Sequence, residues 1–76
     1  MNQSKELFEK LGYYVDTDDD YCISYMNKEA NVRVIFYYED RMVYVLKVAH
    51  INMPLLQAIN KQCEELNWGE ENETMS

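Results

Sequence analysis

Two β-rich runs that follow each other closely dominate the middle of this 76-residue chain. Residues 32–38 read VRVIFYY, residues 42–48 read MVYVLKV, and the charged segment EDR forms a three-residue turn between them. β-Branched and aromatic residues favour strands, and a link this short joins strands that pair antiparallel. Both alternating faces of the runs carry apolar or aromatic side chains. We therefore expect helices to cover one face of a sheet and to leave the other face partly bare.

The spacing of apolar residues predicts a helix at each end of the chain. Residues 2–11 place their leucines and phenylalanine on one helical face, and Gly12 follows where a helix end favours a left-handed residue. Residues 53–66 carry a second apolar stripe, with Asn52 as the N-cap and Pro54 in the first turn. Trp68, which follows that helix, is expected to fold back onto the core.

Two further strands are predicted between the first helix and the hairpin. Residues 13–15 and 21–26 have strand-like patterns, with an acidic turn at residues 16–20 and a polar turn at residues 27–31. Four successive strands with short links form an antiparallel meander. The predicted fold is α+β: helix, four-stranded antiparallel meander, helix, with both helices packed on one face of the sheet.

The arginine in the first run decides which face is expected to be buried. Arg33 disfavours burial of its own side of the strand, so we expect Val34 and Phe36 to point inward. The bare face then forms the candidate protein-binding surface, for which we expect Arg33, Ile35, Tyr37, Val43 and Val45.

The chain is short enough to form one α+β domain over residues 1–69, with residues 70–76 as an acidic disordered tail. A domain of this size buries about 60% of its unfolded surface, so its core is thin. No apolar run approaches the roughly 18 to 20 residues that span a bilayer, which predicts a cytoplasmic protein without membrane contact. Cys22 and Cys63 are expected to be reduced thiols rather than a disulfide.

The net charge of −7 comes from two acidic stretches. Residues 16–20 contribute four acids and residues 64–76 contribute five, so the rest of the chain has seven bases against five acids. Scattered bases of this number do not form the concentrated basic face that phosphates require. Direct binding to nucleic acid is therefore not expected.

The sequence also argues against catalysis, metals and cofactors. The alternating aspartates of residues 16–20 resemble a calcium loop, but Tyr21 stands where that loop needs glycine and Asn27 where it needs glutamate. His50 is the single histidine, and the two glycines fit helix ends rather than a phosphate-binding loop. We expect no enzyme activity, no cofactor and no metal site.

The segments LFEKLGY at residues 7–13 and AINKQ at residues 58–62, with ELNW at residues 65–68, resemble small uncharacterised phage and prophage proteins of Gram-positive bacteria. Those proteins usually have glycine between the leucine and tryptophan of the last motif. Asn67 stands there in this chain and also adopts a left-handed conformation readily. The resemblance implies a phage or prophage origin and a cytoplasmic setting in the host, and it carries no activity.

The leading hypothesis from sequence is a non-enzymatic phage or prophage accessory protein that binds a host or phage protein through the exposed sheet face. One alternative is a structural homodimer without a separate ligand, in which the bare faces of two copies pair. Another is an acidic mimic of nucleic acid that inhibits a host protein through its acidic turn and tail.

Overall fold

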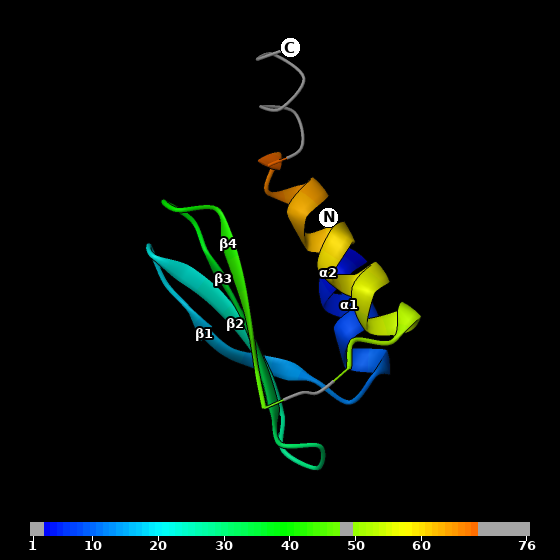
Figure 1. Cartoon of the computed structure of the whole chain (residues 1–76). Helices are drawn as coiled ribbons and strands as arrows, with labels where there is room; N and C mark the ends of the chain where they lie inside the picture. The colour runs from blue at the N-terminus through cyan, green and yellow to red at the C-terminus, as the bar shows by residue number, and fades with distance from the viewer. Residues whose placement is uncertain (1–2, 48–49, 69–76) are drawn as a thin grey trace.

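The structure is a computed structural model that describes residues 3–47 and 50–68. Two helices lie on one side of a four-stranded sheet (Figure 1). The sheet has the order β1-β2-β3-β4, and each neighbouring pair is antiparallel. This arrangement confirms the predicted α+β fold. In chain order the elements are α1 (Gln3–Lys10), β1 (Tyr14–Asp18), β2 (Cys22–Asn27), β3 (Val32–Tyr37), β4 (Met42–Leu46) and α2 (Met53–Glu65).

The helix ends follow the predicted capping residues. Gly12 adopts φ +94° after α1, and its N–H donates to the carbonyl of Glu9 at 3.0 Å. The Asn52 side chain accepts a hydrogen bond from the N–H of Leu55 at 2.9 Å, which caps α2. Asn67, with φ 63°, supplies the left-handed residue after α2. Both helices therefore begin and end close to the predicted residues.

Strand β1 is longer than the sequence predicted. It continues through Asp18, so the expected acidic turn at residues 16–20 is largely strand. Pairing with β2 outweighs the low strand preference of aspartate, and a shift of register between Val15 and Thr17 accommodates one extra residue. The remaining turn is closed by Asp19, whose Oδ1 accepts hydrogen bonds from the backbone N–H groups of Tyr21 and Cys22 at 2.8 and 3.0 Å.

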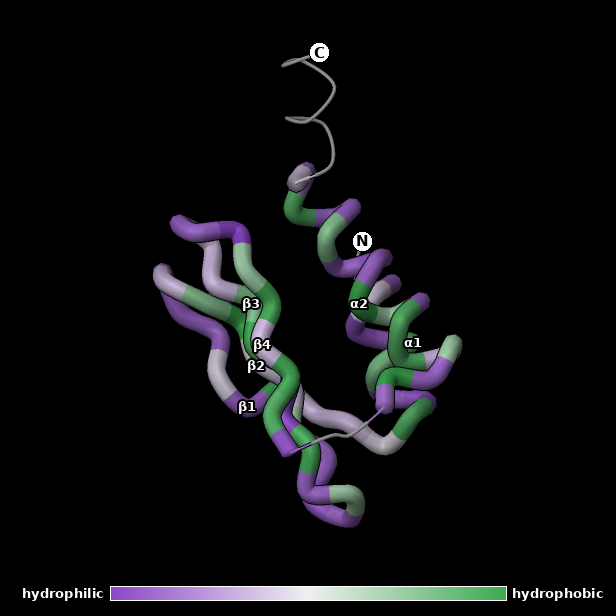
Figure 2. Tube along the Cα trace, viewed as in Figure 1, coloured by the Kyte–Doolittle hydropathy of each residue, from purple (hydrophilic) through white to green (hydrophobic). Residues whose placement is uncertain are grey.

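Two loops of equal length join β2 to β3 and β3 to β4. Asn27 pairs with Val32 and Tyr37 pairs with Met42, so each loop has four residues, 28–31 and 38–41. The last residue of each loop has a positive φ, 59° at Asn31 and 54° at Arg41. Figure 2 shows hydrophilic residues at the hairpin tips and mainly hydrophobic residues along β4. The predicted three-residue turn was therefore one residue too short.

That extra residue decides which side chains of β4 face the helices. A three-residue turn would pair Tyr38 with Met42 and turn Val43 and Val45 outward. The actual register places Val43 opposite Phe36 and Val45 opposite Val34. Because Val34 and Phe36 are fully buried, as predicted, Val43 and Val45 pack against the core and do not belong to the bare face.

The core lies between the sheet and the two helices. The Phe8 ring of α1 stacks on Tyr25 of β2, with ring centroids 4.0 Å apart and planes 13° apart. Trp68 packs against this core with its ring centroid 6.2 Å from that of Phe36, which confirms its predicted return. The buried hydrophobic residues are Phe8, Tyr13, Tyr25, Val32, Val34, Phe36, Leu55, Ala58 and Ile59.

Candidate protein-binding face

The face of the sheet turned away from the helices carries most of the exposed large apolar side chains on the strands. Alternation along paired strands places a defined set of residues on it, which we call the outer face. Its members are Tyr14, Asp16, Thr17, Cys22, Ser24, Met26, Arg33, Ile35, Tyr37, Met42, Tyr44 and Leu46. Five of these, Tyr14, Tyr37, Met42, Tyr44 and Leu46, are between 38% and 46% exposed.

Three of the five predicted surface residues lie on the outer face. Arg33, Ile35 and Tyr37 alternate along β3 and point away from the core residues of that strand. Val43 and Val45 point the other way, and the outward positions of β4 belong to Met42, Tyr44 and Leu46. The sequence MVYVL does not distinguish the two faces of β4, because every residue in it is apolar or aromatic. The length of the loop before β4 therefore determines which of its side chains point outward.

An aromatic pair occupies one end of the outer face. The rings of Tyr37 on β3 and Tyr44 on β4 meet edge to face, with centroids 5.3 Å apart and an interplanar angle of 87°. Such pairs are worth about 0.5–1.5 kcal/mol beyond the area they bury. Each tyrosine keeps about two fifths of its surface exposed, so the pair is both held in place and accessible.

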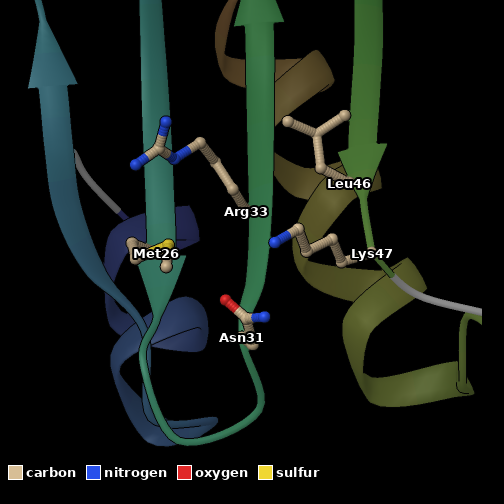
Figure 3. A pocket seen from close by; sticks show the side chains of 5 residues that line it. All are labelled: Met26, Asn31, Arg33, Leu46 and Lys47. Carbon is tan, nitrogen blue, oxygen red and sulfur yellow. The ribbon is translucent and has the colours of Figure 1, made fainter.

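An ion pair crosses the middle of the outer face. The Arg33 side chain leaves β3 and lies across β2, beside Met26 (Figure 3). One of its terminal nitrogens lies 3.2 Å from an Asp16 carboxylate oxygen on β1. The Nε atom of Arg33 is buried and has no hydrogen-bond partner among the described residues.

A pocket opens at the other end of the outer face, beyond the arginine. It has a volume of about 210 Å³ and opens to solvent. Three strands, the loop between β2 and β3 and the residue after β4 bring its lining together (Figure 3): Met26, Asn31, Arg33, Leu46 and Lys47. The aliphatic parts come from Met26 and Leu46, and the two cationic groups come from Arg33 and Lys47.

The acidic, histidine and cysteine side chains show no arrangement for metal binding or nucleophilic chemistry in the described part of the chain. Within residues 3–47 and 50–68, no cluster of three or more His, Cys, Asp or Glu side chains has metal-binding geometry. The two cysteines are free thiols. Burial raises the pKa of the Cys63 thiol, and burial followed by the charges of Asp19 and Asp18 raises that of Cys22. A raised pKa lowers the thiolate fraction at neutral pH, which makes both sulfurs weak nucleophiles.

None of the helices in the described part of the chain has the length and apolar character needed to cross a bilayer. The predicted acidic tail, residues 70–76, lies outside the described residues.

No protein-family model, curated protein or solved structure matches this chain.

Proposed function

We propose that this protein is a non-enzymatic binding module that engages another protein through the outer face. The observation that carries the proposal is the gathering of exposed apolar side chains there. Isolated exposed apolar residues are ordinary on protein surfaces, whereas a contiguous group of them indicates an interaction site. Protein interfaces are also enriched in tyrosine, methionine and arginine, all of which the outer face carries.

The Tyr37 and Tyr44 pair is the proposed centre of this interface. Two rigid rings supply a large contact area at a low cost in side-chain entropy, and residues that dominate binding energy are typically aromatic or arginine. The resemblance to phage and prophage proteins supports a host or phage protein as the partner and a phage or prophage accessory role inside the host cell.

The experiment that tests this function compares protein capture by three versions of the tagged chain. Tyr37→Glu places a charge in the aromatic pair, and Met53→Glu places the same charge on α2, at a methionine that is 63% exposed. Lysate of a Gram-positive bacterium is passed over each, and bound proteins are quantified by mass spectrometry. We expect a partner to be retained by the parent and by Met53→Glu and lost with Tyr37→Glu. Equal capture by all three would contradict the use of this face.

The same surface supports one alternative, a structural homodimer. The outward side chains of β4, Met42, Tyr44 and Leu46, are 43% to 46% exposed, and the outer faces of two copies can bury them against each other. Light scattering of the parent at tens of micromolar separates the alternatives, because an obligate interface of about nanomolar affinity is fully dimeric there. A dimer that Tyr37→Glu dissociates would favour the homodimer, and a monomer would exclude it.

A further inference from the structure

We propose that the pocket beside Arg33 and Lys47 binds the side-chain carboxylate of an aspartate or glutamate in the protein segment that covers the outer face. This inference rests on the proposed function, because it assigns a chemistry to part of the partner. Its evidence is separate from the aromatic pair and consists of the charge of the pocket, the accessible donor groups of its two cationic side chains and the shape of the pocket.

The charge of the pocket is opposite to that of the chain. The protein has a net charge of −7, yet the lining contains two cationic side chains and no acid. Asp16 contacts the guanidinium from the β1 side and is not part of the lining. A carboxylate that enters the pocket therefore meets positive charge at close range, and complementary charge fixes the register of protein interfaces.

Arg33 offers a donor that the described residues leave unused. Its contact with Asp16 is made by one terminal nitrogen and holds the guanidinium in place, while 43% of the side chain stays exposed. The guanidinium therefore keeps donors that a ligand can reach, and a carboxylate is the acceptor that guanidinium groups bind best. Among the described residues no side chain pairs with the Lys47 ammonium, which supplies a second donor at the pocket.

The pocket fits a carboxylate carried on methylene groups. Its volume of about 210 Å³ is well above the 10–15 Å³ that a single water needs. Met26 and Leu46 provide apolar contact for the methylenes, and the Asn31 amide provides a further polar group at the rim. Aspartate and glutamate combine these two parts in one side chain.

The spacing along the sheet sets the minimum length of the partner segment, and we assign the carboxylate to a side chain within that segment. Arg33 pairs with Leu46, and four residues along β3 the Tyr37 and Met42 pair lies on the same face. Four residues of strand span about 13 Å. A partner segment that reaches both the pocket and the aromatic pair is therefore at least four extended residues long, and the side chain of a residue over the pocket can enter it wherever the segment ends.

Three short peptides test the proposal by two-dimensional NMR titration of the whole, isotopically labelled chain. The probes are acetyl-Val-Glu-Val-amide, the matched acetyl-Val-Gln-Val-amide, and acetyl-Val-Gln-Val with a free terminal carboxylate. We expect the glutamate peptide to shift the amides of Asn31, Arg33 and Leu46, with an affinity about tenfold above that of the glutamine amide. Equal affinity of the first two peptides, or no shift at these amides up to about 20 mM, would overturn the proposal. Binding of the free-terminus peptide as tightly as the glutamate peptide would overturn the side-chain assignment.

Charge-neutral variants test whether the two cationic side chains of the pocket cause the preference for the glutamate peptide. Arg33→Gln and Lys47→Gln should each reduce the preference for glutamate by about threefold or more, while Lys10→Gln on α1 removes the same charge elsewhere and should leave it unchanged. A preference for glutamate that survives both pocket variants would overturn the assignment of the pocket.

The outcomes of the capture and titration experiments also separate the two proposals. Loss of capture by Tyr37→Glu without any glutamate preference overturns the pocket alone, and a glutamate preference with capture unaffected by Tyr37→Glu overturns the aromatic centre alone.

Discussion

The hydroxyl of Tyr25 on β2 donates a hydrogen bond of 2.5 Å to Oε1 of Gln62 on α2. The Ser4 hydroxyl oxygen of α1 lies within hydrogen-bond distance of Oε1 of Gln62, at 3.1 Å, and of Oε1 of Glu65, at 2.5 Å. The other carboxylate oxygen of Glu65 accepts a hydrogen bond from the Ser4 backbone N–H at 3.1 Å. Ser4, Tyr25 and Gln62 are each at most 6% exposed. The four side chains therefore form a buried polar network that links both helices to the sheet, and the Glu65 carboxylate complements the positive N-terminal end of α1.

Removal of one hydroxyl from this network should lower the stability of the protein measurably. Ser4→Ala removes a hydrogen-bond partner of the buried Gln62 and of the partly buried Glu65, which costs about 1–3 kcal/mol in the free energy of unfolding. Lys5→Ala, at the exposed neighbouring position of α1, is the matched control and should change it by about 0.5 kcal/mol or less. Urea denaturation followed by circular dichroism measures both, and equal stability of the two variants would show that the network contributes little.

The stability of the protein should fall at alkaline pH through Tyr25. Burial raises the pKa of Tyr25 to about 12, and the negative charge of Glu65 adds to this rise. A hydrogen bond with Ser4 acts in the opposite direction and lowers the pKa. The unfolded chain loses this proton near pH 10, so between about pH 10 and 12 the unfolded state binds fewer protons than the folded state. Stability is then fully present below about pH 10 and decreases by up to about 2–3 kcal/mol as pH rises to 12.

Tyr25→Phe separates this effect from other alkaline changes, because it removes the titrating group and keeps the ring that stacks on Phe8. Urea denaturation at a series of pH values should give a steeper alkaline decline for the parent than for the variant. Parallel declines would assign the loss to other groups, such as Tyr13, whose pKa is also raised by burial.

Sequence patterns predicted the elements of this fold because those elements depend on local chemistry. The caps at Gly12 and Asn52 and the apolar stripe of α2 involve neighbours in the sequence, and each lies where it was expected. The polar network was not predicted, because Ser4 and Gln62 are ordinary surface residue types. Gln62 does lie on the buried stripe of α2, three residues after Ile59, but its partner is set by contacts 58 residues apart in the chain.

The outer face was predicted only in part, for a reason of register. Strand β3 contains Arg33, which marks its outward side, and the three outward residues of that strand were identified from the sequence. Strand β4 has no such marker, so its orientation depends on the length of the loop before it. Because side chains alternate with a period of two, one residue more in that loop reverses every assignment along β4.

The turn after α1 gives a prediction about backbone conformation. Gly12 has φ +94°, and a Cβ there would lie 3.3 Å from the side-chain nitrogen of Asn27, which donates to the Leu11 carbonyl. Gly12→Ala should therefore reduce the free energy of unfolding by about 1–2 kcal/mol. Gly12→Asn carries the same Cβ but tolerates left-handed backbone better, so it should lose less in the same thermal or urea denaturation. Equal losses would assign the effect to the contact with Asn27 rather than to φ.

The assignment of β4 can be tested directly by placing the same charge on its two sides. Val45→Asp inserts a carboxylate among core residues, which should cost about 2–3 kcal/mol in the free energy of unfolding. Leu46→Asp places it on the outer face opposite Arg33, where solvent and the guanidinium accommodate it, and should cost about 1 kcal/mol or less. Both residues are neighbours on one edge strand, so the low strand preference of aspartate affects them similarly. Urea denaturation of the two variants gives the comparison, and a larger loss for Leu46→Asp would mean that β4 presents Val43 and Val45 to solvent after all.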